Sequence, residues 1–346
     1  MPSLKEIKGR INSISSTLAI TSAMKMVAAA KLQKAQMAIQ NMLPYERRLH
    51  SMLIDLMGAV NMSAPASEEG SARLVSLSNQ PDHTESEGAY SLMAQRQVHR
   101  VAIVAFASNS SLCGAFNSNV IREATAVINE YRASGLGDAD ITVYSVGRKM
   151  AEAMRKLGFP SPADFTKMSD SPSYDAASAL AQELFDGFVS GRFDKVELVY
   201  NHYKSTSSQP TTRQTYLPLS LADATADIQV GKITDSASES DTNRGAESVG
   251  APVVRQGSPT TETPDLIVEP SKEELIVTLL PKVVRLRVFT TLLDSTAAEQ
   301  AARTVAMQLA TDNGNDLLQE LTLEYNKGRQ QKITSEILDL VGGSMQ

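Results

Sequence analysis

One segment of the chain carries residues that could bind a phosphate group or supply a nucleophile. Residues 108–117, Ser-Asn-Ser-Ser-Leu-Cys-Gly-Ala-Phe-Asn, lie between an apolar run and a helical pattern, and a loop that opens a helix presents free backbone N–H groups. The segment lacks both the Gly-Lys-Ser/Thr of a P-loop and the three-glycine dinucleotide fingerprint. Cys113 has no histidine beside it in the sequence. We therefore expect no nucleotide site here and a buried, inert thiol.

The other groups that could do chemistry form no catalytic or metal-binding pattern. The four histidines are scattered along the chain, at His50, His83, His99 and His202, and no Cys/His cluster has metal-ligand spacing. Neighbouring carboxylates occur in helical patterns, where exposure to solvent or helix capping explains them. We predict no catalytic residue, no metal and no cofactor in this chain.

The elements that would position these residues are dominated by two long helical patterns at the chain ends, residues 1–57 and 281–341. At ~1.5 Å per residue each helix would be roughly 80 to 90 Å long, whereas a compact chain of this length would be only about 50 Å across. At least one helix must therefore project from the body as a rod.

Both ends have the apolar spacing of a coiled coil, with alternating steps of three and four residues. Near the start the steps run through Leu4, Ile7, Ile11, Ile14 and Leu18, and near the end through Leu279, Val283, Leu286, Phe289 and Leu293. We predict an antiparallel coiled coil. The alternative is two amphipathic helices wrapped on the middle domain. Pro44 should kink or divide the first helix, because proline removes a backbone donor.

The apolar seam of the first helix weakens in its centre. The in-register positions there are small or polar: Thr21, Lys25 and Ala28. The more apolar residues sit one position off: Ile20, Met24 and Val27. Small residues let a partner helix approach closely, and methionine adapts to changing surfaces.

The middle of the chain alternates strand and helix patterns. We expect strands over residues 98–106, 141–146 and 195–203, helices over 116–131, 147–157 and 176–188, and an edge strand over 211–219. This alternation predicts a layered α/β domain with a mostly parallel sheet. The predicted fold class is α/β: an antiparallel coiled coil of long N- and C-terminal helices plus a central Rossmann-like α/β domain.

Composition divides the chain into five parts: an N-terminal shaft helix (1–57), a polar insertion (58–97), an α/β base domain (98–219), a low-complexity polar insertion (220–264) and a C-terminal shaft helix (265–346). The two insertions are rich in polar residues and glycine, so they can bury little apolar surface. We expect mobile loops with weak order in both.

The charge is moderate overall but unevenly distributed. A net charge of −6 argues against general affinity for nucleic acid. Between Ile7 and Tyr45 there is no acidic residue, and five basic residues lie along this stretch: Lys8, Arg10, Lys25, Lys31 and Lys34. Such a run is usually a solvated helix face. A sharper interpretation is that it faces acidic protein surfaces, since no aromatic residues interleave for base stacking.

Several features indicate the compartment. A single cysteine excludes an internal disulfide and suits a reducing environment. No apolar run approaches the ~20 residues needed to cross a bilayer, and the start lacks the apolar core of a signal peptide. We expect a cytoplasmic protein that associates with a membrane only through other proteins.

Five motifs make the sequence specific. They are Leu4-Lys-Glu-Ile-Lys-Gly-Arg-Ile-Asn-Ser-Ile, Ile20-Thr-Ser-Ala-Met-Lys-Met-Val-Ala-Ala-Ala-Lys-Leu, Leu112-Cys-Gly-Ala-Phe-Asn, Ala306-Met-Gln-Leu-Ala-Thr-Asp-Asn and Leu323-Glu-Tyr-Asn-Lys-Gly-Arg-Gln-Gln-Lys-Ile-Thr-Ser-Glu-Ile. Together and in this order they resemble the gamma subunit of the rotary F-type ATP synthase. The resemblance covers residues 3–57, 98–219 and 265–343.

The resemblance implies a non-catalytic central rotor shaft. The paired terminal helices would stand inside a ring of three alpha and three beta subunits, and the α/β domain would contact the epsilon subunit and the ring of c subunits. Ion flow through the c ring would then drive ATP synthesis by rotation. The implied location is peripheral, at the cytoplasmic face of the bacterial inner membrane.

The family's contact residues carry over where the motifs match. Met24 and Lys25 fall in the motif that lies near an acidic loop of the beta subunit. In the family, C-terminal positions contact the beta subunits, and the matching residues here are Arg303, Arg329, Gln330, Thr334 and Glu336. Tyr200 and Asn201 resemble residues near the c ring. The alternative for each is an ordinary surface residue of the coiled coil.

The sequence departs from the family pattern in places, for example at Ser110 and Ser111, where a charged residue and glycine are more usual. Two other function classes stay open from the sequence alone: a cytoplasmic coiled-coil adaptor or scaffold without rotation, and an enzyme that uses the strand-turn-helix at Ser108.

Overall fold

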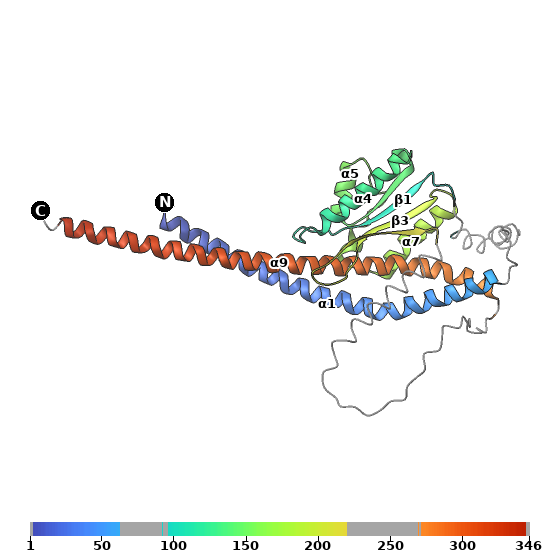
Figure 1. The fold of residues 1–346 in the computed structure, drawn as a ribbon, viewed down its shortest axis with the longest axis horizontal. Coiled ribbons are helices and arrows are strands. Elements are labelled where there is room, and N and C mark those ends of the chain that lie inside the picture. The colour runs from blue at the N-terminus through green and yellow to red at the C-terminus, as the bar shows by residue number, and fades with distance from the viewer. Residues whose placement is uncertain (1–2, 63–91, 93–95, 220–268, 270, 344–346) are drawn as a thin grey trace, which may run out of the picture.

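A computed structural model describes residues 3–62, 92, 96–219, 269 and 271–343. The predicted polar insertions, 58–97 and 220–264, fall almost wholly outside these residues, so their expected weak order lies outside the described part. Two very long helices, at the two ends of the described chain, lie together on one side of a four-stranded sheet and its covering helices (Figure 1).

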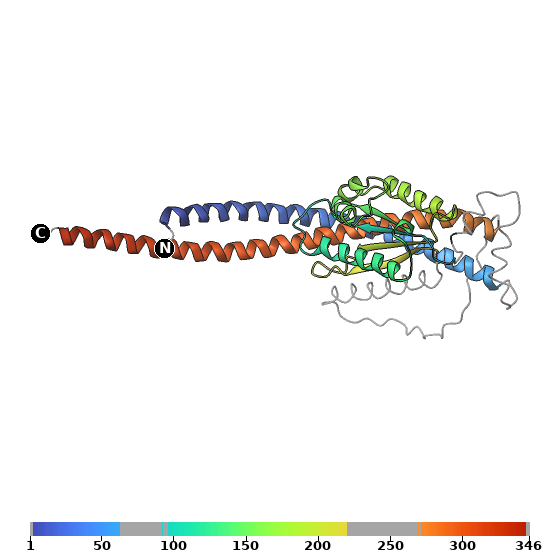
Figure 2. The ribbon, with the colours of Figure 1, turned by 90° about the horizontal axis from the view of Figure 1, so that it is seen from above.

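The two terminal helices are α1, Leu4–Met62, and α9, Lys272–Gly343. They run antiparallel side by side and project together from the α/β body (Figures 1 and 2). The C-terminal end of α9 continues past the start of α1. The predicted rod and antiparallel pairing are confirmed.

Both helices extend beyond the helical patterns 1–57 and 281–341 that the sequence shows, although α9 stays within the C-terminal part assigned to 265–346. α1 runs five residues beyond the predicted boundary at 57. α9 begins at Lys272, ahead of Pro281, because Ser271 caps it by accepting a hydrogen bond from the Glu274 N–H at 3.2 Å. The expectation that Pro44 could divide the first helix was wrong.

Pro44 lies inside one continuous helix, which changes direction in its lighter-blue second half (Figure 1). A proline inside a helix costs about 3 kcal/mol. Three leucines that follow it, Leu49, Leu53 and Leu56, are buried. Each contributes about 1.5 to 3 kcal/mol, so their packing keeps the helix intact beyond the proline.

Small residues fix the register of the helix pair. A Cβ atom placed on Gly314 would lie 2.6 Å from Cδ2 of Leu18, and one on Gly328 would lie 3.1 Å from Cδ2 of Leu4. Each glycine therefore accepts a leucine of α1 against its backbone. Closer to the α/β domain, Ala297 and Ala301 of α9 pack with Leu32 and Ala35 of α1.

The sheet has the order β2-β1-β3-β4. Its strands are β1, Val101–Phe106; β2, Ile141–Val146; β3, Lys195–Asn201; and β4, Thr211–Leu217. β1 pairs in parallel with β2 and β3, while β4 is an antiparallel edge strand on β3. The mostly parallel sheet and the edge position of β4 are as predicted, although β1 starts three residues later than expected and β3 ends two residues earlier.

The helices of the domain are α4, Phe116–Ala133; α5, Arg148–Lys156; α6, Thr166–Asp170; and α7, Tyr174–Val189. A short 3₁₀ turn, η2, spans Asp138–Asp140. Neither α6 nor η2 was predicted, because elements this short have no clear periodicity. A tertiary hydrogen bond, from Nδ2 of Asn109 to the Thr166 carbonyl at 2.7 Å, fixes the start of α6.

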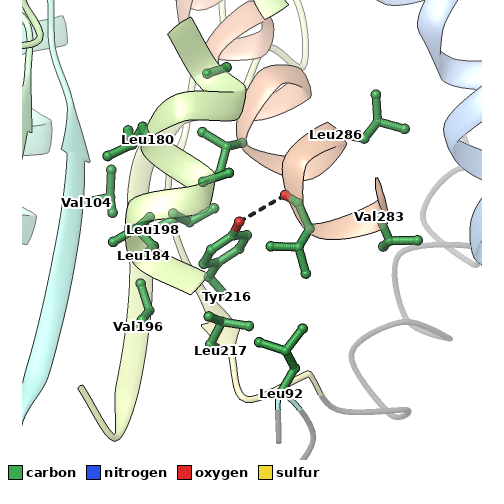
Figure 3. Close-up of a cluster of buried hydrophobic side chains, with 14 of the residues drawn as sticks. Leu92, Val104, Leu180, Leu184, Val196, Leu198, Tyr216, Leu217, Val283 and Leu286 are labelled. Carbon is green, nitrogen blue, oxygen red and sulfur yellow. Dashed lines mark hydrogen bonds between the residues drawn. The ribbon is translucent and has the colours of Figure 1, made fainter. Parts of the chain in front are cut away.

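The sheet is covered on both faces. α4 and α5 pack on one face, and α7 and the N-terminal half of α9 pack on the other (Figure 1). In the core between the sheet, α7 and α9, the Tyr216 hydroxyl donates to the Val284 carbonyl at 2.9 Å. Leu180, Leu184 and Val283 lie around this hydrogen bond (Figure 3). The alternative of helices wrapped on the domain is thus true of this half of α9. The same helix forms a layer of the domain and then the rod.

Candidate partner-contact surface

Met24 and Lys25 lie on the part of α1 that pairs with α9, but their side chains differ in environment. Met24 is 41% exposed, whereas Lys25 is half-buried and donates from Nζ to Oε1 of Gln308 on α9. Gln308 in turn donates to both carboxylate oxygens of Asp312, at 2.8 and 2.9 Å. Lys25 is therefore held within the helix pair, and Met24 faces outward.

Met24 is part of an apolar row that faces away from α9. Ile20, Met24 and Val27 are all exposed, while the in-register Ala28 is buried and the hydroxyl of Thr311 on α9 donates to that of Thr21 at 3.1 Å. The residues one position off the seam thus form an outward row. Its members beyond Met24 were missed as candidates, although the offset in the apolar pattern was the signal that could have found them.

Arg303 is engaged inside the chain. Its guanidinium pairs with Glu299 at 2.7 Å and donates to Oγ of Ser110 at 2.7 Å, and its side chain is only 14% exposed. Burial raises the pKa of Glu299, and the neighbouring Arg303 opposes that rise. Arg303 therefore joins α9 to the loop after β1, and a contact with another subunit would have to compete with these internal contacts.

That loop, residues 108–117, is closed on itself and packed on α9. The Ser108 N–H donates to Oδ1 of Asn117 at 3.0 Å, and Asn117 donates from Nδ2 to Oγ of Ser108 at 2.8 Å. Cys113 is buried with Phe116 against Ala298 of α9. The predicted burial of the thiol is confirmed. Because the loop's polar groups bond to one another, its geometry does not favour the phosphate-cradle interpretation.

Four of the predicted contact residues lie together near the end of α9. Arg329, Gln330, Thr334 and Glu336 are all exposed, and the Thr334 hydroxyl donates back to the Gln330 carbonyl at 2.9 Å. Glu336 pairs with Lys332 at 3.7 Å, with both side chains largely exposed. Such pairs contribute only about 0 to 1 kcal/mol. These side chains are therefore available to a partner.

The apolar residues of the same end are also uncovered. Ile333, Ile337, Leu338 and Leu340 are between 47% and 75% exposed. Leu4, at the start of α1, lies over Gly328, so this stretch of α9 extends beyond its partner helix. A helix with exposed apolar and polar faces, beside which no other helix of the described residues lies, indicates an interaction site.

Tyr200 and Asn201 lie in the interior of the α/β domain. Asn201 is 1% exposed, donates to the Phe116 carbonyl at 3.1 Å and accepts from the Thr211 hydroxyl at 2.7 Å. Tyr200 is buried in the core beside α9. We therefore assign both residues to the frame of the sheet. The expected contact with the c ring stays a prediction. In this chain Asn201 is covered by α4 on one face of the sheet, and Tyr200 lies in the core on the other face, so neither side chain is exposed.

Among the described residues, no group of three or more His, Cys, Asp or Glu side chains is arranged to hold a metal ion. In the same part of the chain, none of the helices has a stretch apolar and long enough to span a membrane.

The comparisons with known proteins agree with this arrangement. A family model described as "ATP synthase" matches residues 3–345. The ATP synthase gamma chain of Phocaeicola vulgatus is 48% identical over 345 residues, covering 100% of both chains, and that of Bacteroides thetaiotaomicron is 46% identical over 346 residues with the same coverage. The chain belongs to the ATP synthase gamma chain family.

Solved structures show the same fold at lower identity. A chain of the mitochondrial ATP synthase of Euglena gracilis, in the OSCP/F1/c-ring structure, has a TM-score of 0.54 and 18% identity, covering 99% of this chain and 93% of its own length. A rotor chain of the same organism gives a TM-score of 0.51. The fold of a gamma chain, a helix pair projecting from an α/β base, is therefore confirmed.

Proposed function

We propose that the chain is the central rotor shaft of an F-type ATP synthase, not catalytic itself, which couples ion flow through a c ring to ATP synthesis or hydrolysis in a ring of alpha and beta subunits. The observation that carries the proposal is the antiparallel pair α1–α9 projecting from the α/β domain in a chain of the gamma family. An adaptor without rotation is not favoured, since the match to gamma chains covers the whole chain.

The packing supports transmission of torque. α9 is buried in the domain core at Leu280, Val284 and Val288 and continues without a break into the rod. Burial of one such side chain contributes about 1.5 to 3 kcal/mol. The domain and the shaft therefore turn as one body, and a force applied to the domain reaches the tip of α9.

The surface of the rod suits a shaft that meets three equivalent partners in turn. Its exposed charges, such as Arg329, bind a partner with about 0 to 1 kcal/mol each. Charge contacts of this strength hold each position without trapping the rotor in one of them, and the exposed apolar residues at the end of α9 add to the binding.

The proposed partners are three alpha subunits, three beta subunits, an epsilon subunit and the c ring. Binding to nucleic acid is not part of the proposal. The c ring would place the chain at the cytoplasmic face of a bacterial inner membrane as a peripheral subunit. Support comes from the bacterial gamma chains that match along their full length.

Reconstitution tests the assembly. The full chain mixed with purified alpha and beta subunits should give a complex with one gamma chain per three alpha-beta pairs, read by native mass spectrometry. A complex with one copy per pair, or no complex, contradicts the proposal.

A single-molecule assay tests rotation. A bead on the native thiol is impractical, because Cys113 is buried. Lys156 is exposed at the end of α5, so Lys156→Cys offers a reachable attachment point on the domain. Beads on this variant should turn in steps on addition of ATP. The unmodified chain, which should take no label, is the control, and labelled complexes that hydrolyse ATP without turning would favour a static scaffold.

A further inference from the structure

The segment that follows β3 contacts both shaft helices. On α9, the carboxylate of Asp294 binds two consecutive residues: Nδ1 of His202 lies 2.6 Å from Oδ2, and the backbone N–H of Tyr203 donates to Oδ1 at 2.9 Å. The two oxygens of one side chain thus fix the exit of the strand. Neither Asp294 nor His202 is among the contact residues that the gamma family motifs indicate.

Tyr203 extends the connection to α1. Its hydroxyl accepts a hydrogen bond from Nε2 of Gln36 at 2.7 Å. Its ring packs beside Ala297, Ala301 and Leu32, where the two helices meet. Two neighbouring residues of the domain therefore hold α9 through a carboxylate and α1 through an amide.

These polar contacts differ from the apolar packing below them. The core between α9 and the sheet consists mostly of apolar side chains, whose attraction has no preferred direction, with one hydrogen bond from the Tyr216 hydroxyl to the Val284 carbonyl. Hydrogen bonds to a carboxylate do have a preferred direction. The Asp294 contacts therefore act with two other directional contacts, from Tyr216 to Val284 and from Arg303 to Ser110, in setting the angle at which the domain sits on the shaft, whereas the apolar core sets how firmly it is attached.

The charge on His202 governs the strength of the contact. The charged groups that act on the imidazole are Asp294 from α9 and Lys204 from its own loop, and α1 contributes the neutral Gln36. The hydrogen bond with Asp294 raises the pKa of His202, against the opposite effects of burial and of Lys204. The protonated imidazole and the carboxylate form an ion pair whose side chains are 42% and 18% exposed.

We propose that Asp294 and His202 are a positioning pair that fixes the orientation of the α/β domain on the shaft, and that this attachment loosens when His202 loses its proton. The attachment itself is independent of the rotary role. Its consequence for coupling rests on the proposed function, because a domain that rocks on the shaft delivers torque to the tip less completely.

Hydrogen exchange of the isolated full chain tests the attachment. After correction for the intrinsic effect of pH on exchange, protection of the Tyr203 amide should fall severalfold as the pH rises from about 6, below the ordinary histidine pKa, through the raised pKa of His202. In Asp294→Asn the amide oxygen still accepts from Tyr203, so protection should be independent of pH. His202→Gln should behave likewise, and Asp316→Asn, at an exposed position of α9, should match the unmodified chain. Constant protection in the unmodified chain, or an unchanged pH dependence in Asp294→Asn, overturns the proposal.

A second measurement tests the consequence for coupling. In the assembled complex, Asp294→Ala should lower the number of protons pumped per ATP hydrolysed while hydrolysis continues, and Asp294→Glu should restore part of the loss. Unchanged pumping in Asp294→Ala overturns the positioning role. If the unmodified chain forms no complex at all, the proposed function fails, and the exchange experiment still decides whether the attachment exists.

Discussion

Lys25 and Arg303 are charged residues on the shaft whose side chains make contacts within the chain. Lys25 bonds to Gln308 across the helix pair, and Arg303 joins Glu299 and Ser110. Arg329, by contrast, is exposed near the tip of α9. Substitutions at these positions should therefore separate loss of stability from loss of partner binding.

Arg303→Gln should destabilise the chain by about 2 to 4 kcal/mol, because it leaves the buried carboxylate of Glu299 without its cation. Arg329→Gln, a matched change at an exposed position, should alter stability by less than about 0.5 kcal/mol. Urea unfolding of the two full-length variants measures both values. Equal midpoints would show that the Arg303 pair is of no importance to the fold.

Met24→Lys should leave the free energy of unfolding nearly unchanged, because Met24 is exposed. Under the proposed function it adds a charge to the outward apolar row and should impair coupling. Protons pumped per ATP hydrolysed, measured in reconstituted vesicles, check this. A normal ratio would remove Met24 from the contact surface.

Glu197 gives the α/β domain a dependence on pH. Burial alone would raise the pKa of this 1% exposed glutamate, but hydrogen bonds from Arg213, Lys195 and Tyr131 lower it overall. A lowered pKa in the folded state means that Glu197 stabilises the fold above the ordinary glutamate pKa and that this contribution is lost as the pH falls through the folded pKa. Unfolding free energies from pH 7 to pH 3 should therefore decline less steeply in Glu197→Gln. The same slope in both proteins would contradict this assignment.

At the scale of elements, α9 has two environments along one uninterrupted helix. Its N-terminal half is a layer of the domain core. Among the described residues, its C-terminal half packs against α1 and then extends beyond the start of that helix. The helix tolerates Pro281 because the residues around it, Leu279, Leu280 and Val283, are buried. Apolar burial in the N-terminal half thus stabilises one helix whose C-terminal half contacts little of the chain apart from α1.

Two helical glycines should respond to alanine in opposite directions. In Gly328→Ala the new methyl group meets only the flexible end of Leu4, so removal of the glycine should stabilise the helix by up to about 1 kcal/mol. In Gly187→Ala of α7 the methyl group would lie 2.5 Å from the buried ring of Phe193, so the variant should lose about 1 to 3 kcal/mol. Thermal unfolding followed by circular dichroism compares them, and the same sign for both would contradict the packing described.

At the scale of the whole molecule, the long axis is set by the 72 residues of α9. A straight helix of this length measures about 110 Å. Small-angle scattering of the full chain in solution should give a maximum dimension of at least that size. A particle close to the ~50 Å expected for a compact domain of this length would mean that the helices fold back on the sheet.

The sequence by itself determined the long helices, the four strands and the family. The steps of three and four residues from Leu4 to Leu18 predicted the rod, and the run before Ser108 predicted the first strand, because both patterns are local and periodic. The same patterns predicted a parallel sheet with β4 at its edge. The family motifs supplied the candidate contacts, since a motif records residue types and not their surroundings.

Only the tertiary structure decided which of these residues face solvent. It placed Asn201 in the interior and Arg303 in an internal ion pair, and it left Arg329 exposed. It also brought Asp294 to His202, ninety-two residues away. No local pattern encodes such contacts, because burial and ion pairing depend on which distant segment packs against a residue, and the long helices extend across several such surroundings.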